Sequence, residues 1–312
     1  MKRKLLSPLA DPIFKRIFGE EKDIMMSLIN AAIELKDPVV EIEYLQPELV
    51  GEHLYEKTTI VDVRCKDARN RHFIVEMQIS LHKDFLKRVL FNACKVYSRQ
   101  LPSGSAFEDL QPVHCLCILN NSMDLDLPHY VQTYNLAKVS DPSIQMEGIH
   151  FHFIELSKFM KKATFDLKNP LQAWMKFFAE PEYFSTMPIK HYETFEELKK
   201  AIEMLDESNF TEGQLYAYDK YMDNIRTQKS IEAYQKEVGH AEGKKQGIAE
   251  GLAEGRAEGK EIGLAEGKTL GIDITLSIIN ELRNGQLTVN QIAEKFQVSE
   301  EVVMKISQEI SK

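Results

Sequence analysis

Residues 60–80, IVDVRCKDARNRHFIVEMQIS, decide the fold, because they form two apolar stretches joined by a polar turn at 68–70. This pattern predicts a β-hairpin. Each strand carries one carboxylate, Asp62 and Glu76, and a charged group that faces a core is costly unless it is paired or binds a metal. Pairing across the hairpin can bring the two carboxylates together, and alternation places Gln78 on the face of Glu76. With a nearby main-chain carbonyl they would form a hard oxygen site suited to Mg²⁺. Taken alone the spacing is a weak pattern, since many hairpins would match it by chance.

The elements expected around this hairpin follow the order helix, strand, strand, strand, helix, strand. Apolar residues at helical spacing predict a helix within 11–35, with Asp11 as its N-cap, Pro12 at the first helical position and a division into two short helices possible at Gly19. The two hairpin strands are expected at 58–67 and 71–80. The other expected elements are a strand within 39–55, a helix at 82–101, buried strands at 112–120 and 149–159, a helix at 169–180 and helical structure throughout 193–237.

The charge distribution is uneven. The chain of 312 residues has a net charge of −9, yet residues 57–99 hold ten lysines and arginines against four acids. A basic surface around two buried acids would suit a site that handles phosphodiesters. A solvated hairpin face explains the same charges, so charge alone leaves both interpretations open.

Cysteine and histidine spacing gives no clear metal site. Cys65, Cys94, Cys115 and Cys117 contain no C-x-x-C pair, and buried reduced thiols in a cytosolic protein are the simplest interpretation. His150 and His152 share one face of a predicted strand, a spacing that a metal could use, but no third ligand is evident and structural or surface histidines are expected. The first residues lack the apolar core of a signal peptide, and no apolar run reaches the roughly 18 residues of a membrane span. We therefore expect a cytoplasmic protein with no membrane partner.

The tail contains a strict repeat, with glycine at every fourth position from Gly239 to Gly271. Each glycine costs a helix about 1 kcal/mol relative to alanine, and glutamates four residues apart repel one another. A helix here should be stable only when packed, with close backbone approach and a right-handed crossing if two copies meet. Helical self-association and a disordered linker both remain open.

Residues 287–306 resemble a helix-turn-helix, with Thr288 and Ser299 as candidate N-caps. The second helix would begin with Glu300 and Glu301, where a DNA reader normally offers positive or amide groups. A packing or dimerising helical hairpin is therefore favoured over base reading. The expected small core comprises Ile292, Ala293, Phe296, Val298, Val302 and Val303.

Asp62, Glu76 and Gln78 lie on the second and third strands of the expected order, and this arrangement resembles the core of the PD-(D/E)xK nuclease superfamily. Within it, the chain closely resembles the Rpn family of recombination-promoting nucleases and putative transposases. The matching stretches are DPIFKRIFG (11–19), IVDVR (60–64), FIVEMQIS (73–80), KDFLKRVLFNACKVYSRQL (83–101), PVHCLCIL (112–119), IHFHFIELSKF (149–159) and the Ala-Glu-Gly tail.

The resemblance implies a DNA endonuclease that depends on Mg²⁺, with Mn²⁺ as an alternative ion. Asp62 and Glu76 would bind the metal, with the Met77 carbonyl as a further candidate ligand. Asp11 and Lys15 match the family's D..FK signature, although a helix cap and a surface lysine would explain them equally simply. Gln78 occupies the usual lysine position of the superfamily, as is common in the Rpn family. Glutamine can orient a water but supplies no positive charge, which leaves open whether Lys15 supplies it.

Candidates for gripping DNA phosphates are basic and aromatic residues on the second strand and the following helix, each of which could equally be structural. They are Arg64, Lys87, Arg88, Tyr97 and Arg99. DNA and a second copy of the chain, bound through the glycine repeat, are the expected partners. A role in recombination, mobile elements or defence against foreign DNA is implied by the family alone. A DNA-binding accessory protein with a weak or inactive site, and a scaffold that acts through its tail, are the alternatives.

The expected fold class is α/β, with a restriction-endonuclease-like core (a central mixed sheet flanked by helices) and an all-helical C-terminal region. The expected parts are the nuclease core at 1–160, a helical extension at 161–236, the Gly-x-Ala-Glu repeat helix or linker at 237–273 and the C-terminal helical hairpin at 274–312.

Overall fold

A computed structural model describes residues 4–50, 57–102, 104–123, 127–162, 164–187 and 195–310. The chain divides into two compact units, Met1–Ile225 and Arg226–Lys312. Each unit is described by itself below.

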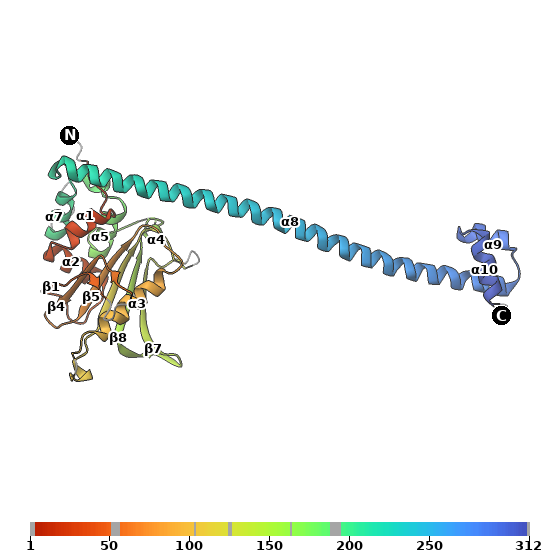
Figure 1. Cartoon of the computed structure of the whole chain (residues 1–312), viewed down its shortest axis with the longest axis horizontal. Helices are drawn as coiled ribbons and strands as arrows, with labels where there is room; N and C mark the ends of the chain where they lie inside the picture. The colour runs from red at the N-terminus through yellow and green to blue at the C-terminus, as the bar shows by residue number, and fades with distance from the viewer. Residues whose placement is uncertain are drawn as a thin grey trace. The chain divides into compact units, whose positions relative to one another are not determined.

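The first unit is built on a six-stranded mixed sheet with the strand order β1-β4-β5-β6-β8-β7 (Figure 1). The three central strands β5, β6 and β8 are parallel to one another, whereas β1 and β4 at one side and β7 at the other are antiparallel to their neighbours. The strands are β1 (Ile42–Tyr44), β4 (Val63–Asp67), β5 (His72–Gln78), β6 (Val113–Leu119), β7 (Val131–Lys138) and β8 (Asp141–Glu155). The mixed sheet with flanking helices confirms the expected α/β class.

The hairpin of β4 and β5 is confirmed, and Asp67 organises its turn. One carboxylate oxygen of Asp67 accepts hydrogen bonds from the main-chain N–H groups of Arg69 (3.0 Å) and Arg71 (2.9 Å). Asn70 adopts the left-handed conformation at φ 59°, which asparagine tolerates better than most residues. The turn thereby sets the register in which Val63 lies opposite Val75.

The first strand of the hairpin is shorter than predicted. Thr59–Ile60 (β3) pairs with Glu48–Leu49 (β2) in a separate two-stranded sheet, so the expected strand at 58–67 is broken before β4 begins. Asp62 therefore lies in the link between β3 and β4 rather than within a strand. The expected strand at 39–55 is likewise two short strands, β1 and β2, and its residues 51–55 lie outside the described residues.

Helices cover both faces of the sheet, and each face has its own core. Phe73, Val75 and Met77 of β5 pack on the side of α1, α2, α5 and α7, while Ile74 packs on the side of α3. This alternation confirms the two-faced interpretation of β5. These helices are α1 (Asp11–Phe18), α2 (Lys22–Ala32), α3 (Phe85–Ser98), α5 (Pro170–Ala179) and α7 (Glu196–Met204), with short helices α4 (Leu156–Phe159) and α6 (Glu182–Thr186) beside them.

The first helix differs from its prediction at the cap. Ala10 is the N-cap of α1 and makes no side-chain cap hydrogen bond, so Asp11 is the first helical residue and Pro12 the second. The division at Gly19 is confirmed, since α1 ends at Phe18 and α2 begins at Lys22. The shift by one residue lets the Asp11 side chain point along the helix, where Lys15 lies one turn on.

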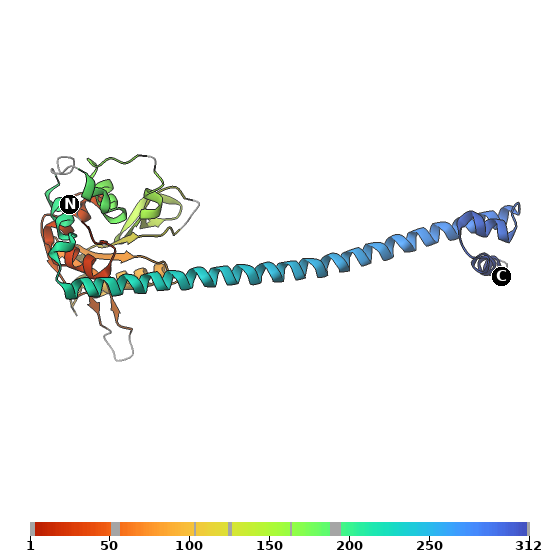
Figure 2. The ribbon, with the colours of Figure 1, turned by 90° about the horizontal axis from the view of Figure 1, so that it is seen from above.

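One strand escaped prediction. The strand expected at 149–159 is part of a longer strand, β8, which ends at Glu155, and residues 156–159 form the short helix α4 instead. β8 pairs with β7, a strand that the sequence did not predict (Figure 2, yellow-green). Residues 132–147 are mostly exposed, so no buried face imposes an alternating apolar pattern on them. Exposure also corrects the cysteine prediction, because Cys94 is exposed while Cys65, Cys115 and Cys117 are buried and all four are free thiols.

The helical structure expected throughout 193–237 is interrupted. After α7, a 3₁₀ turn at Glu207–Asn209 precedes a long helix, α8 (Glu212–Asn284), and residues 193–194 lie outside the described residues. Leu215, Tyr218, Tyr221 and Met222 of α8 pack against the core that contains α1. The first turns of α8 are thus part of the first unit, which contains the sheet.

In the second unit, the glycine repeat lies within α8, and α9 (Val289–Phe296) and α10 (Glu300–Ile310) follow. Thr288 caps α9 in a full capping box with Gln291, as predicted. Ile278, Ile292, Ala293 and Val303 form the buried core, whereas Val302 is 43% exposed, which corrects its predicted core position. Among the described residues, no helix combines the length and apolar character needed to cross a membrane.

Candidate active site

The two carboxylates of the hairpin come together where β4 begins and β5 ends. Because Val63 pairs with Val75, Asp62 is placed beside Glu76. The Met77 main-chain N–H donates a hydrogen bond of 2.7 Å to Asp62 Oδ2, which holds that side chain against β5. Glu76 is only 4% exposed, and its Oε1 is buried without a hydrogen-bond partner. The arrangement leaves one carboxylate oxygen with an unmet need for a donor or a cation.

Burial dominates the electrostatics of the pair. It raises the pKa of Glu76 to about 8, with the charge of Asp62 adding to the rise and Arg88, Asn92 and Lys15 opposing it. Asn92 lies close enough to lower this pKa, although its amide is not aligned for a hydrogen bond. Burial likewise raises the pKa of Asp62, against the Met77 N–H. Burial raises the pKa of both acids, and the charge of Asp62 raises that of Glu76 further, which is a state that a bound divalent cation would relieve.

Lys15 and Asp11 of α1 are electrostatic neighbours of Asp62. Lys15 Nζ lies 2.9 Å from Asp11 Oδ1. Burial lowers the pKa of Lys15, but the hydrogen bond to Asp11 and the charges of Asp11 and Asp62 outweigh it and raise that pKa. Lys15 is thus a positive charge close to Asp62 that is already paired with another acid.

Tyr221 is a neighbour of the site that sequence reasoning missed. Burial and the charges of Asp11 and Asp62 raise the pKa of its hydroxyl, with the Asp11 main chain and Lys15 opposing this. It comes from α8, more than 140 residues after Glu76 in the sequence, and no local motif marks it. Only the packing of α8 beside α1 reveals the contact.

Gln78 is the last residue of β5, the strand that carries Glu76. Gln78 is half-buried at the end of β5, and its main-chain oxygen accepts a hydrogen bond from Asn120 N–H (2.9 Å). No group of three or more histidine, cysteine, aspartate or glutamate side chains among the described residues is arranged to hold a metal. Asp62 and Glu76 still fit a Mg²⁺ ion, which often takes only one or two carboxylates and keeps several waters. The partnerless Oε1 of Glu76 supports that fit.

The five candidate DNA contacts fall in different places. Arg88, in the first turns of α3, lowers the pKa of both acids and so lies near them, and its guanidinium carbon is 5.7 Å from the centre of the Phe85 ring. Lys87 is exposed beside it. Tyr97 instead packs near Gly148 of β8, where a Cβ would come within 3.7 Å of its hydroxyl. Arg64 and Arg99 line a separate hollow, so the structure brings only Arg88 to the acids and places Lys87 next to it.

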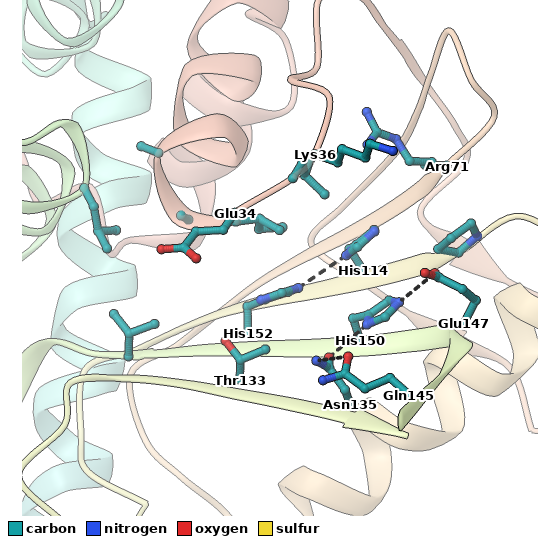
Figure 3. Close-up of a pocket in the computed structure, with 17 residues that line it drawn as sticks. Glu34, Lys36, Arg71, His114, Thr133, Asn135, Gln145, Glu147, His150 and His152 are labelled. Carbon is teal, nitrogen blue, oxygen red and sulfur yellow. Dashed lines mark hydrogen bonds and ion pairs between the residues drawn. The ribbon is translucent and has the colours of Figure 1, made fainter. Parts of the chain in front are cut away.

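The histidines of β6 and β8 form a second cluster, shown in Figure 3. His114 Nδ1 lies 3.3 Å from His152 Nε2, and the His114 ring stacks on His150 with centroids 4.8 Å apart. Burial lowers the pKa of His114 to about 3 and that of His152 to about 4, so both are neutral near pH 7. They line a hollow of about 640 Å³. His114 lies opposite His150 in the strand register, a neighbour that spacing within one strand could not reveal.

Residues 8–234 match the family described as PD-(D/E)XK nuclease family transposase. Neither a curated protein nor a solved structure matches the chain. The matched range holds both carboxylates and the whole described sheet, and it confirms the resemblance inferred from the sequence.

Proposed function

We propose that this chain, which belongs to the family of PD-(D/E)XK nuclease transposases, is an endonuclease that hydrolyses DNA phosphodiester bonds with a divalent cation held by Asp62 and Glu76. The family supports a nuclease associated with mobile elements. The observation that carries the proposal further is the pairing of the half-buried Asp62 with the buried Glu76, whose Oε1 has no hydrogen-bond partner. A structural acid would be expected to have its hydrogen bonds satisfied.

Mg²⁺, with Mn²⁺ as the alternative, would polarise a phosphoryl oxygen and lower the pKa of a bound water. The chain's own residues prepare the site. The Met77 N–H fixes Asp62, and the Gln78 amide, at the end of β5, would orient a water. Lys15 and Arg88 bring positive charge toward the same acids, where negative charge on the phosphate would increase during hydrolysis. Lys87 and Arg88 on α3 are the proposed DNA contacts next to the acids.

A DNA-binding accessory protein with a weak nuclease site is the second candidate, and one observation favours it. Gln78 replaces the usual lysine of the superfamily, and Lys15 is ion-paired with Asp11 at 2.9 Å. A lysine shared between two acids supplies less net positive charge to a phosphate than a free one. Cleavage would then be slow while DNA binding persisted.

The test is cleavage of supercoiled plasmid by purified protein with Mg²⁺, with Mn²⁺ and with EDTA. Asp62→Asn and Glu76→Gln remove one ligand charge each with little change in shape. Glu41→Gln is the matched control, because Glu41 is exposed and precedes β1 outside the site. We expect metal-dependent nicking that survives in the control and falls at least a thousandfold in both site variants, about 4 kcal/mol of transition-state stabilisation. DNA binding without any metal-dependent nicking would establish the accessory protein instead.

We also propose that copies of the chain associate through the glycine repeat of α8. A Cβ built on any glycine from Gly239 to Gly271 would meet nothing within 4 Å in the described structure, so the chain's own packing does not require glycine there. These glycines weaken the helix by about 1 kcal/mol each relative to alanine. Close approach of a second helix is the physical benefit that glycine offers in return.

Replacing Gly247, Gly251 and Gly255 together by alanine tests this association. We expect the triple variant to shift toward monomer in sedimentation velocity, whereas Gly213→Ala, at the start of the same helix, should not. A wild-type protein that is monomeric at all concentrations would contradict the proposal. In that case alanine would simply stabilise the helix.

A further inference from the structure

A second hollow, of about 380 Å³, lies between the β4–β5 hairpin and the segment that follows α3. Its charged side chains are Arg64 and Lys66 from β4, Arg99 after α3, and a single acid, Asp109. The hollow therefore carries an excess of positive charge. His72, Gln100, Ser105 and Gln111 also line it.

Arg64 is the most informative residue of this hollow. Its side chain is partly buried, and its Nε is shielded from water without a hydrogen-bond partner. Within the described residues, no acid forms an ion pair with it. A guanidinium offers five donors in a fixed fork, so leaving it in a partly buried site without an acceptor is unfavourable. The second guanidinium in the same hollow adds like-charge repulsion instead of relief.

His72, at the start of β5, gives an independent sign of a missing ligand. It is 9% exposed, lines the hollow, and has a buried Nδ1 with no partner. Its main-chain N–H is satisfied by the Pro112 carbonyl at 2.9 Å, so only the side chain is left unpaired. Two side chains in one hollow each have a buried polar atom without a partner, and this shared feature calls for a common explanation.

The surrounding residues are held in place by their own contacts. Lys66 pairs with Glu43 at 3.1 Å. The Gln100 side chain bonds the main chain of Gln111 twice, at 2.9 Å each, and thereby fixes the segment that closes the hollow. The walls are thus already held in place around Arg64, whose Nε has no partner.

We propose that this hollow binds a phosphate group of the DNA backbone, with Arg64 as its principal ligand and Arg99 and His72 beside it. Phosphate matches the planar fork of arginine and would neutralise the charge that the hollow concentrates. Arg64 follows Asp62 by only two residues in the chain. The hollow would thus hold a phosphate near the one that is cut, and in this respect the inference rests on the proposed function.

The test measures binding of a fluorescent duplex of 30 base pairs by anisotropy, in EDTA, so that no cleavage is needed. Arg64→Gln removes the charge but keeps the length and polarity of the side chain. We expect its Kd to rise at least tenfold and the slope of log K against log salt to fall by about 1, as expected for one lost phosphate contact. The matched control is Lys83→Gln, which removes an exposed charge before α3, outside the hollow, and should change the Kd by less than threefold. Equal Kd values for wild type and Arg64→Gln would overturn the proposal.

Two further measurements keep the outcome unambiguous. Ser105→Glu places a carboxylate at the exposed rim of the hollow and should also raise the Kd, so the result does not depend on the folding of one variant. Inorganic phosphate serves as the second probe, by thermal unfolding. If it stabilised the wild type but not Arg64→Gln while duplex affinity were equal, the hollow would be a site for free phosphate and the DNA assignment would be overturned. If the wild-type protein did not nick plasmid but Arg64→Gln still weakened duplex binding, the nuclease proposal would be refuted and the proposed phosphate site would be retained.

Discussion

Glu155 and Glu76 are both almost fully buried in the first unit, yet their surroundings are opposite. Glu155 accepts hydrogen bonds from Ser122 Oγ (2.6 Å), Met123 N–H (3.0 Å) and Gln132 Nε2, and Lys158 Nζ lies 3.0 Å from its Oε2. Glu76 has a partnerless oxygen and a second acid for a neighbour. The fold can therefore satisfy a buried carboxylate where it needs one for structure.

Other buried charges follow the pattern of Glu155. Arg71 pairs with Asp67 at 2.6 Å, and Lys95 donates to the carbonyls of Leu49 and Lys57. Among the described residues, six side chains have a buried polar atom without a hydrogen-bond partner, and three of them, Arg64, His72 and Glu76, lie on the β4–β5 hairpin. Unpaired buried groups of opposite sign on one hairpin suit a ligand that carries both a cation and phosphates.

The largest expected effect is on the pH dependence of stability through Glu76. Its pKa is raised from 4.5 to about 8 in the folded protein, so the folded state holds a proton that the unfolded state has released, and stability falls as pH rises through that window. At about 1.36 kcal/mol per pKa unit, the full loss approaches about 5 kcal/mol. Glu76→Gln stays neutral, so in the absence of metal it should be more stable than wild type at pH 9 and about equal at pH 4.

Urea denaturation of both proteins at pH 4 to 9, with EDTA present, checks this prediction. Glu41→Gln again serves as the control and should follow the wild-type curve. A wild-type stability that stays flat from pH 5 to 9 while Glu76→Gln gains nothing would show that Glu76 is satisfied, like Glu155.

Glu155→Ala should lower the free energy of unfolding, whereas Glu76→Gln should raise it at high pH. Glu155→Ala would leave Lys158 buried without its carboxylate, and removing one partner of a buried pair typically costs about 3 to 5 kcal/mol. We expect this loss throughout pH 5 to 9, measured by the same urea denaturation. If Glu155→Ala were as stable as wild type, the ion pair of Glu155 with Lys158 would contribute nothing to stability. Glu155 would then no longer serve as the structural counterpart of Glu76.

Binding of a divalent cation gives a smaller effect that sharpens the comparison. A cation that binds only the folded state at one hundred times its Kd adds about 2.7 kcal/mol of stability. Mg²⁺ or Mn²⁺ should therefore raise the melting temperature of wild type at pH 8, and the rise should vanish in Asp62→Asn and Glu76→Gln. Ca²⁺ tests whether the oxygen site accepts a larger ion. Equal shifts in wild type and both variants would place the cation elsewhere.

The hairpin and its acids were predictable from the sequence because their signals are local. Alternation over residues 71–80 reports two packed faces, and a charge inside that alternation stands out. The break after Ile60 was not predictable, because β3 is paired with β2 and nothing local marks the change of partner. As a result, Asp62 lies in the link between β3 and β4, where its side chain accepts a hydrogen bond from the Met77 N–H.

The parts of the site that escaped prediction depend on distant packing. Tyr221 reaches the acids from α8, and Arg99 turns out to share a hollow with Arg64 instead of lying by Glu76. The sequence predicted Arg64 and Arg99 as candidate phosphate contacts, but it could not predict that both line the same hollow. In the same way, β7 lacks a buried face, so its pairing with β8 left no trace in its pattern of apolar residues.

Lys15 gives the smallest expected effect on stability and a direct test of whether it assists the acids. Its ion pair with Asp11 spans one helical turn at the surface, and such pairs contribute about 0.3–0.5 kcal/mol. Lys15→Gln should therefore unfold within about 0.5 kcal/mol of wild type. If Lys15 supplies the charge that Gln78 lacks, the same variant should nick plasmid at least tenfold more slowly. Gln78→Lys in that background should then restore part of the rate, because it returns a positive charge to the end of β5. Unchanged nicking by Lys15→Gln would assign Lys15 to the surface pair alone.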